Sequence, residues 1–311
     1  MTEPSAKDGL LPAQAVRAFI EAGHIGADVP ISPAQVQPAS LDLRLGGVAY
    51  RVRASFLPNT RMTVEAKLDA FGLHEIKLGE GAVLETGCVY VAPLQERLRL
   101  PADISAAANP KSSTGRLDVF TRVITSTGPA FDEIPRGYDG PLYAEICPQT
   151  FPVLVRPGSL LAQIRFRRGE PARTDAELMS LHREQRLVST EAADIAGGIA
   201  LSVDLSGESD GGVIGYRAKR HTGVVDMDKP GAYALDDFWE PIHARAERRL
   251  ILDPDQFYIL ASKEAIHVPP SHAAEMVPFN PLVGEFRVHY AGFLDPDRKS
   301  TRLNSSHRTG S

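Results

Sequence analysis

The segment Asn109-Pro-Lys-Ser-Ser-Thr-Gly-Arg116 places an ammonium group, three hydroxyls and a guanidinium close together around a glycine. A turn of this kind can surround phosphate oxygens with side-chain and backbone donors. The segment lacks the GxxxxGK[ST] spacing of the Walker loop, so it would hold phosphate in another way. Its composition alone favours an ordinary polar loop, and other parts of the chain must decide between the two interpretations.

A second candidate is the carboxylate of Glu145, in the strand-like segment Leu142-Tyr-Ala-Glu-Ile146 that follows Gly137-Tyr-Asp-Gly140. Alternation along a strand places Tyr143 and Glu145 on the face opposite to the aliphatic residues. A carboxylate rooted in a strand is held rigidly, as a general base must be to reach its proton. A solvent-facing strand glutamate is the alternative interpretation.

A third candidate is Gln163, which ends the segment Gly158-Ser-Leu-Leu-Ala-Gln163 inside an apolar strand. A buried glutamine needs hydrogen-bond partners. These partners can be structural, or they can belong to a ligand.

These candidates must be positioned by a strand-rich fold. Val16, Phe19 and Ile20 lie at helical spacing before Gly23, which predicts one short N-terminal helix. Strand-like runs separated by Pro and Gly then dominate, a pattern typical of an all-β barrel or sandwich. The predicted strands span residues 40–45, 48–52, 88–91, 119–124, 142–146 and 160–166.

Bulk composition narrows the class of protein. The chain has 311 residues, of which 43% are hydrophobic, and this favours two soluble domains. A net charge of -5 argues against a general nucleic-acid binder. The cysteines, Cys88 and Cys147, give neither a disulfide framework nor a CxxC metal pair, which favours a reducing, cytoplasmic setting. We expect no membrane segment, because no apolar run approaches membrane-spanning length.

The sequence pattern of the first part recurs after a polar stretch at residues 171–197, which is predicted to be a linker with a helix over 174–185. Residues 201–207 echo residues 39–46, and residues 258–269 echo residues 90–101 in the same order. Two ordered echoes favour an internal duplication. We therefore expect a first domain over 1–170, and a second, degenerate and truncated copy over 198–296.

The last residues, 297–311, have no apolar periodicity and resemble the translation of a DNA sequencing adapter. We expect a non-native tail that lies outside the fold. A natural disordered tail is the alternative, since such a polar composition permits it.

Taken together, four motifs resemble the dUTPase and dCTP deaminase superfamily in their type and order. They are Ser40-Leu-Asp-Leu-Arg-Leu-Gly46, Lys111-Ser-Ser-Thr-Gly-Arg116, Gly137-Tyr-Asp-Gly140 and Gly158-Ser-Leu-Leu-Ala-Gln163. The resemblance implies a dUTPase-like β-barrel, related to the jelly roll, that assembles as a homo-oligomer of trimer type. The double-length layout resembles a tandem-domain bacterial subgroup of dCTP deaminases.

The resemblance also implies a reaction, the deamination of dCTP to dUTP and ammonia. Glu145 is expected to take a proton from the attacking water, with Ser112 orienting that water and Arg116 near the reacting centre. Substrate contacts are expected from Lys111, Ser113, Asp132, Tyr138 and Gln163, with Mg²⁺ accompanying the triphosphate. The PCxxC part of the zinc deaminase signature cannot be formed from Cys88 and Cys147, so no zinc is expected.

The sequence departs from the superfamily pattern at several points. Lys111 replaces the usual arginine and loses its planar fork, and the usual Asp-Pro-Gly is expanded to residues 131–137. In the second copy Phe279-Asn-Pro281 stands where Lys-Ser-Ser is expected, which predicts a structural role for that copy. Three rival functions remain: a dUTP diphosphatase, alone or combined with the deaminase; a non-catalytic nucleotide-binding protein; and, as the weakest, a purely structural β-protein.

Overall fold

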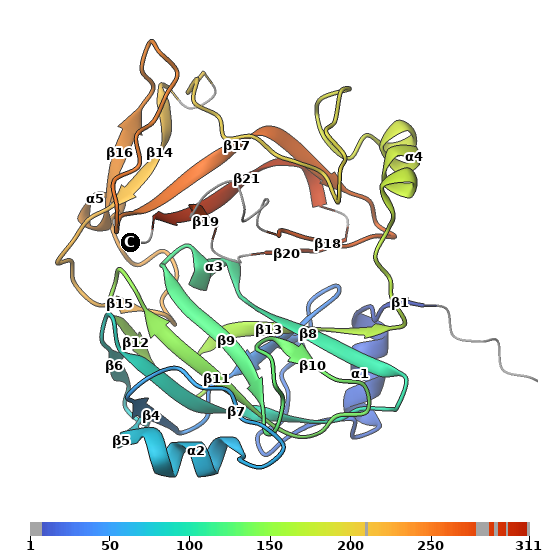
Figure 1. Ribbon diagram of the computed structural model, residues 1–311, viewed down its shortest axis with the longest axis vertical. Helices are drawn as coiled ribbons and strands as arrows, with labels where there is room; N and C mark the ends of the chain where they lie inside the picture. Colours follow the sequence, from blue (N-terminus) through green and yellow to red (C-terminus); the bar gives the residue numbers. More distant parts are fainter. Residues whose placement is uncertain (1–7, 209–210, 278–285, 289–291, 297, 310–311) are drawn as a thin grey trace, which may run out of the picture. The chain divides into compact units, whose positions relative to one another are not determined.

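The chain is mostly β-structure with few helices, as the ribbon of its computed structural model shows (Figure 1). It divides into two compact units. Unit 1 comprises Met1–Lys111, Thr121–Cys147 and Leu154–Ala172, and unit 2 comprises Ser112–Phe120, Pro148–Val153 and Arg173–Ser311. The structure describes residues 8–208, 211–277, 286–288, 292–296 and 298–309.

The helices are short, and two of them were predicted from the sequence. The N-terminal helix α1 buries Val16 completely and is followed by Gly23 at φ 74°, which confirms the predicted helix and its end. Helix α4 begins at a capping box in which the side chains and backbone of Thr174 and Glu177 bond reciprocally. The helices are α1 (Ala13–Glu21), the 3₁₀ helix η1 (Pro33–Gln35), α2 (Val64–Phe71), α3 (Ser112–Gly115), α4 (Asp175–Gln185) and α5 (Leu235–Phe238).

The strands of unit 1 form two main sheets. One sheet runs β1-β13-β8-β10, with β3 also paired to β13, and the other runs β5-β4-β7-β11-β9, with β2 also paired to β7. The strands are β1 (Gly9–Leu10), β2 (Ile25–Ala27), β3 (Leu41–Arg44), β4 (Val48–Val52), β5 (Gly72–Lys77), β6 (Ala82–Leu84), β7 (Val89–Arg99), β8 (Ile104–Pro110), β9 (Val119–Thr125), β10 (Glu133–Ile134), β11 (Asp139–Pro148), β12 (Val153–Val155) and β13 (Leu160–Arg168). Each run predicted as a strand therefore overlaps one, and the predicted runs 40–45 and 88–91 extend one residue beyond the observed ends.

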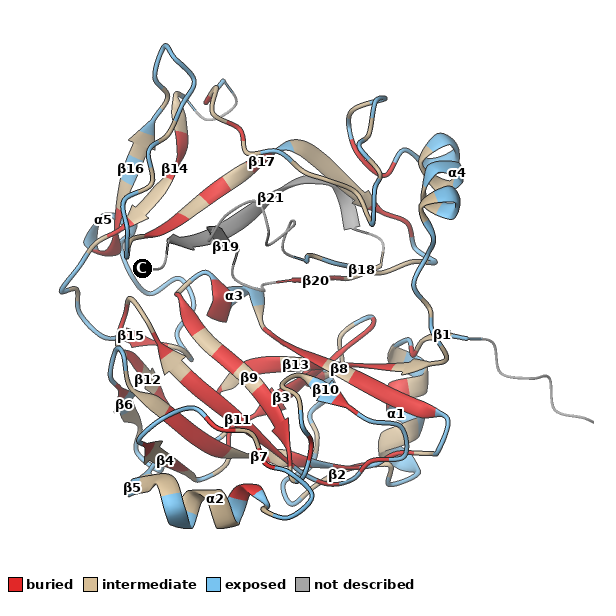
Figure 2. Cartoon of the chain, in the orientation of Figure 1, coloured by how far each residue is buried: buried red, intermediate tan, exposed pale blue. Residues whose placement is uncertain are grey.

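Strands β7, β11 and β9 are largely buried, whereas α4 has no buried residue and is mostly exposed (Figure 2). Tyr143 and Ile124, from β11 and β9, share a hydrophobic cluster with Val64 of α2. Phe56 belongs to the same cluster, and Phe131 packs against it. This face of the sheet is therefore covered by α2 and its preceding loop, so the polar side chains on it lie against protein as well as solvent.

Unit 2 contains the remaining elements and its own aromatic core. Its sheet runs β16-β14-β17-β21-β19. Trp239 lies 5.4 Å from Phe151 and 5.8 Å from Phe257 between ring centroids. The strands are β14 (Val213–Ala218), β15 (Val225–Asp226), β16 (Trp239–His243), β17 (Phe257–Val268), β18 (Ala274–Glu275), β19 (Phe286–Val288), β20 (Phe293–Leu294) and β21 (Arg298–Thr309).

The two units repeat one local arrangement in the same register. In unit 1, Arg51 of β4 pairs with Tyr90 of β7, and in unit 2, Arg217 of β14 pairs with Tyr258 of β17. Each tyrosine hydroxyl accepts a hydrogen bond from the backbone N–H five residues earlier, at 3.1 Å for Tyr90 and 2.9 Å for Tyr258. The echo around residues 201–207 is weaker, because the structure gives that segment one isolated bridge, Val203 to Ser262, and no regular strand.

The C-terminal stretch lies within a sheet, contrary to the expectation that it stands outside the fold. The backbone of β21 pairs with that of β17. Phe257 lies opposite Arg308 at one end of this pairing, and Val268 lies opposite Arg298 at the other. Composition did not reveal this strand because the stretch has no apolar alternation. That residues 297–311 are non-native stays a prediction, and Phe279-Asn-Pro281 lies outside the described residues.

Candidate active site

Glu145 is held on β11 as a nearly inaccessible carboxylate. The residue is 4% exposed. Its neighbour across the antiparallel pairing on β7 is Val91. Oε1 of Glu145 accepts a hydrogen bond and ion pair from Nη2 of Arg122, whereas Oε2 is buried without any hydrogen-bond partner. A buried acceptor that lacks a partner is unusual and calls for a ligand or a function.

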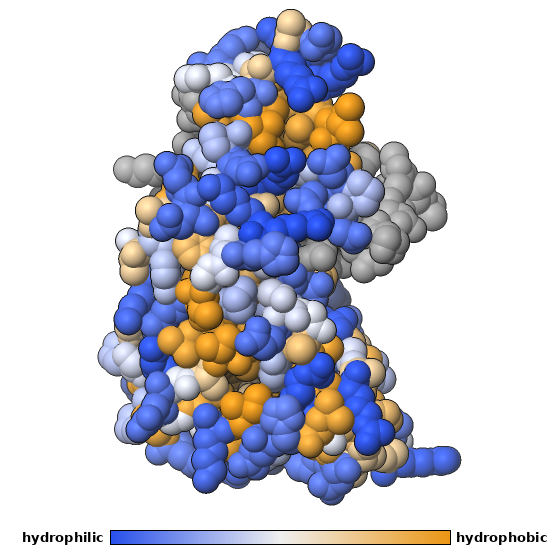
Figure 3. Space-filling model, turned by 90° about the vertical axis from the view of Figure 1, so that its left-hand side faces the viewer, coloured by the Kyte–Doolittle hydropathy of each residue, from blue (hydrophilic) through white to orange (hydrophobic). Residues whose placement is uncertain are grey.

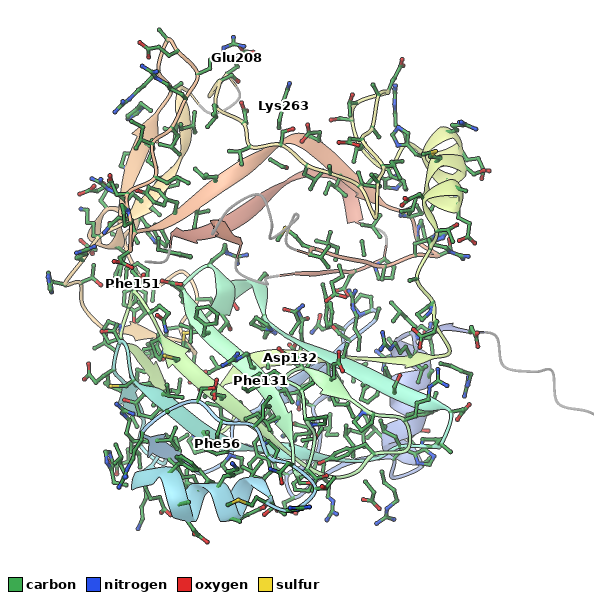
Figure 4. All side chains as sticks on the ribbon, viewed as in Figure 1. Phe56, Phe131, Asp132, Phe151, Glu208 and Lys263 are labelled. Carbon is green, nitrogen blue, oxygen red and sulfur yellow. The ribbon has the colours of Figure 1, made fainter. Side chains whose placement is uncertain are left out.

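Arg122 reaches Glu145 from the adjacent strand β9. Nη2 of Arg122 also donates to Oγ of Ser55 at 3.2 Å. Its guanidinium carbon lies 3.6 Å from the centroid of the Phe131 ring, within the range of a cation–π contact. Figure 4 labels Phe131 beside Asp132 in the loop that precedes β10. The guanidinium is therefore fixed by three different groups, and one side of the carboxylate is fixed with it.

Tyr143 lies two residues from Glu145 on the same face of β11. Its hydroxyl donates a hydrogen bond to Oε1 of Glu65 in α2. Burial, and then the hydrogen bond to Glu65, raise the pKa of Tyr143 well above its usual value. Tyr143 therefore stays protonated and acts as a hydrogen-bond donor. The alternative of a solvent-facing strand glutamate at position 145 does not hold, because this face is covered.

A second polar group forms on the other sheet of unit 1, where β3, β13 and β8 are neighbours. Gln163 pairs in register with Asp42 on one side and with Asn109 on the other. Oε1 of Gln163 accepts from Oγ of Ser40, and its Nε2 donates to the Pro110 carbonyl, both at 3.4 Å. Both contacts are long, so the Gln163 amide can exchange them for stronger partners.

Lys111 follows β8 directly and joins this second group. Its Nζ forms an ion pair with Oδ2 of Asp42, a residue that is 2% exposed. The backbone N–H of Lys111 donates to the Leu161 carbonyl at 2.9 Å. Lys111 and Gln163 thus both lie next to Asp42, one through an ion pair and the other through the strand register, and Asp42 is an acidic partner that the sequence analysis did not name.

Tyr138 is used to hold a turn. Its hydroxyl donates to the Pro141 carbonyl at 2.5 Å and accepts from the Ser126 backbone N–H at 3.0 Å. A Cβ on Gly140 would lie 2.7 Å from this hydroxyl, and Gly137 has φ 67°. The Gly-Tyr-Asp-Gly sequence therefore has a structural cause: its glycines allow the tyrosine to close the turn. A substrate contact by Tyr138 stays a prediction.

Asp132 adopts a positive φ of 62° in the loop between β9 and β10. Its Oδ1 accepts from the Val123 backbone N–H at 2.7 Å, and its own N–H donates to the Val123 carbonyl at 2.8 Å. These bonds fasten the loop to β9, the strand that carries Arg122. The predicted sugar or base contact by Asp132 stays a prediction.

The remaining predicted residues, Ser112, Ser113 and Arg116, belong to unit 2. Ser112 and Ser113 begin the short helix α3 and are exposed, and the backbone N–H of Arg116 donates to the Ser112 carbonyl at 3.0 Å. Thr114, between them, is fully buried and its hydroxyl has no hydrogen-bond partner. The two exposed hydroxyls are available to a ligand.

Sequence reasoning missed Arg122 and Asp42. Both were visible as charged residues inside strand-like runs, in Phe120-Thr-Arg-Val123 and in Leu41-Asp-Leu43. A charged side chain inside an apolar strand needs a partner. The sequence could have shown that a partner exists, but not which one, because the pairing depends on the order of strands in the sheet.

Comparison with known proteins places this arrangement in a family. The profile of the 2′-deoxycytidine 5′-triphosphate deaminase N-terminal domain matches residues 7–170, and that of the C-terminal domain matches residues 174–307. The chain belongs to the 2′-deoxycytidine 5′-triphosphate deaminase family. It is accordingly an enzyme that acts on the cytosine amino group of a deoxynucleotide.

Relatives in this family differ in the length over which they match. The dUMP-forming dCTP deaminase of Mycolicibacterium vanbaalenii is 34% identical over half of this chain and 78% of that protein. The dUMP-forming enzyme of Corynebacterium glutamicum is 31% identical over 57% of this chain and 92% of its own length. The crystal structure of the Agrobacterium tumefaciens deaminase is 55% identical, with a TM-score of 0.94 over 98% of this chain and 93% of that one.

Within the part of the chain that the structure describes, every helix is too short or too polar to cross a bilayer. On the face drawn in Figure 3, polar and apolar side chains lie in interspersed groups. A member of this family acts on a small nucleotide.

Proposed function

We propose that the chain deaminates dCTP with Glu145 as the general base. The observation that carries this proposal is the buried Oε2 of Glu145, which has no partner, beside an Oε1 that Arg122 occupies. Oε2 has an unused acceptor site in a covered position. A water molecule bound there would be polarised towards the carboxylate, as general base catalysis requires.

The proposed reaction adds water to C4 of the cytosine ring. Glu145 takes one proton from the water as its oxygen bonds to C4, and the proton passes to the ring nitrogen. The second water proton goes to the exocyclic amino group, and the bond between C4 and that amino nitrogen breaks. Ammonia leaves, and the base that stays on the nucleotide is uracil. Ser112 would orient the water through its hydroxyl, and Arg116 would favour negative charge that develops at the reacting centre.

The triphosphate would be held by Lys111, Ser113 and Gln163. Lys111 and Gln163 lie in one polar group of unit 1, and the long hydrogen bonds of Gln163 leave it able to turn to a ligand. Asp132, in the loop before β10, and Tyr138, in the turn before β11, would also contact the substrate. Lys111 already has Asp42 as a partner, so a phosphate would share the ammonium group with this carboxylate.

Mg²⁺ would accompany the triphosphate as part of the substrate. Among the residues that the structure describes, no three His, Cys, Asp or Glu side chains gather as a ligand set. Mg²⁺ that accompanies a nucleotide is usually held by phosphate oxygens and water, with few ligands from the protein. The protein residues would contact the phosphates and leave the ion to them.

The sequence analysis expected dUTP as the product, and the named relatives favour dUMP instead. Several curated relatives at 31–34% identity are named dUMP-forming. These names favour the bifunctional alternative, in which deamination is followed by loss of pyrophosphate. We therefore propose dUMP, pyrophosphate and ammonia as the products, with dUTP as the product if only the first step occurs.

We further propose that both parts of the chain are copies of one dUTPase-like barrel. The repeated register of Arg51 with Tyr90 and of Arg217 with Tyr258 supports this duplication. The two tyrosines also accept the same backbone hydrogen bond. A homo-oligomer of trimer type is proposed from the family resemblance.

The test is a product analysis with dCTP and Mg²⁺. Ammonia and pyrophosphate in equal amounts would support the bifunctional enzyme, and ammonia without pyrophosphate would restore dUTP as the product. Incubation with dUTP as substrate separates the two steps. A folded protein that binds dCTP but releases neither product would contradict this proposal. The non-catalytic nucleotide-binding function would then replace it.

A further inference from the structure

The guanidinium of Arg122 is built into the face of the sheet that carries Glu145. It contacts the carboxylate from β9, the Ser55 hydroxyl from the loop after β4, and the Phe131 ring from the loop before β10. The Arg122 side chain is 36% exposed and the Glu145 side chain is 4% exposed. The ion pair therefore joins a shielded carboxylate to a guanidinium that still reaches solvent.

The two carboxylate oxygens of Glu145 have different surroundings. Oε1 is engaged by Arg122, and Oε2 is buried without a partner. Rotation of the carboxylate would exchange the two oxygens, and the ion pair resists that rotation. An arginine stacked on an aromatic ring is suited to this role because its planar group is fixed in orientation as well as position.

We propose that Arg122 is a positioning residue for the deamination, which holds Glu145 so that Oε2 faces the attacking water. The inference rests on the proposed function, because it requires Glu145 to be the base. Arg122 acts through the carboxylate and does not itself contact the reacting atoms. Its loss should therefore lower kcat and leave KM for dCTP nearly unchanged.

The other groups near Glu145 do not replace this charge. Val91 stands opposite on β7, and it is apolar. The Tyr143 hydroxyl, on the same strand as Glu145, is bonded to Glu65 of α2. Arg122 is thus the cation that the described structure places on this carboxylate, and its removal would leave Oε1 without the group that fixes it.

The experiment compares kcat and KM for dCTP in Arg122→Gln, Arg122→Lys and the wild-type enzyme. We expect Arg122→Gln to lower kcat by about 100-fold, the usual effect of a misplaced catalytic group, with KM nearly unchanged. Arg122→Lys keeps the charge and loses only the planar fork, so it should recover part of the loss, with kcat about 10-fold below that of the wild type.

A matched control is Arg99→Gln. Arg99 pairs with Asp139 across the same two strands, β7 and β11, but at 3.6 Å and with both side chains largely exposed. This variant should retain the wild-type kcat and KM. Thermal unfolding followed by circular dichroism establishes that each variant is folded at the assay temperature.

The outcomes separate the inference from the function on which it rests. An inactive Glu145→Gln together with the predicted changes in both Arg122 variants supports the inference. An inactive Glu145→Gln with an unchanged kcat in Arg122→Gln, or with a kcat as low in Arg122→Lys as in Arg122→Gln, overturns it and leaves the proposed function standing. An active Glu145→Gln removes the proposed function, and the inference with it.

Discussion

The Tyr143 hydroxyl donates a hydrogen bond to the Glu65 carboxylate and so ties strand β11, which carries Glu145, to helix α2. Tyr143 is 5% exposed, and its ring packs with Val64 and Ile124. The bond joins the helix to the strand at a point two residues from Glu145. Its strength should therefore affect both stability and the position of the helix that covers this face.

Replacing Tyr143 by Phe should destabilise the protein in a pH-dependent manner. Burial raises the pKa of Glu65, but hydrogen bonds from Tyr143, from its own backbone N–H and from Thr63 outweigh this and lower the pKa below its usual value of 4.5. A lowered folded-state pKa contributes stability above the unfolded value, and this stability is lost as pH falls through the folded value. Because Glu65 is largely exposed, we expect a cost of about 1 kcal/mol at neutral pH.

The measurement is chemical denaturation of Tyr143→Phe, Glu65→Gln and the double variant at neutral pH and below pH 4.5. A coupling energy at neutral pH that shrinks in acid is the expected result. Additive single effects at both pH values would contradict the hydrogen bond as a source of stability.

Gly140→Ala should destabilise the turn that Tyr138 closes. The added Cβ would lie 2.7 Å from the Tyr138 hydroxyl and 3.0 Å from its ring carbon Cζ. We expect a cost of about 1–3 kcal/mol, measured by chemical denaturation, as for other overpacked sites. Gly47→Ala is the control, because nothing lies within 4 Å of a Cβ there. Adding Tyr138→Phe to Gly140→Ala should recover part of the loss, and a Gly140→Ala variant as stable as Gly47→Ala would show that the contact is absent.

A buried ion pair makes Glu96 a sensitive position. Its Oε1 accepts from Nε of Arg44 at 2.7 Å and from Nε2 of Gln35 at 2.9 Å, and its Oε2 accepts from the Arg44 backbone N–H at 2.8 Å. Glu96→Gln would leave Arg44 without a counter-charge, and we expect a cost of about 3–5 kcal/mol. Asp103→Asn, in the more exposed pair with Arg168, should leave the thermal midpoint unchanged. Equal midpoints for the two variants would argue against a stabilising role for the buried network.

The local pattern of the sequence was enough to predict single elements. The helical spacing of Val16, Phe19 and Ile20 corresponds to α1, and the apolar alternation of residues 142–146 corresponds to part of β11. Both signals arise within a few neighbouring residues, where backbone geometry alone sets which side chains share a face. Helix α2 was not predicted, because its burial depends on a strand, β11, that is distant in sequence.

Contacts between elements could not be predicted from the sequence for a related reason. Glu145 was predicted as a candidate base, but its partner Arg122 lies on β9, which is the neighbour of β11 in the sheet. Lys111 was predicted as a phosphate ligand, but its partner Asp42 lies on β3. Strand order decides these pairs, and a charged residue inside an apolar run shows only that some partner is needed.

The backbone pairing of β21 shows the limit of composition as a guide. Residues 298–309 lack apolar alternation, yet their backbone groups pair with β17. Main-chain hydrogen bonds do not depend on side-chain type, so an available strand edge can accept a polar segment. Alternation therefore predicts strands from their side chains and misses a strand whose pairing is seen only in the backbone.

The central claim is that Glu145 is the base in the deamination of dCTP, and Glu145→Gln tests it most directly. Glutamine keeps the shape of the side chain and loses the ability to take a proton. We predict that the variant folds, binds dCTP with an affinity close to that of the wild type, and releases ammonia about 10²–10⁴ times more slowly. Ammonia release at the wild-type rate by the folded variant would contradict the account.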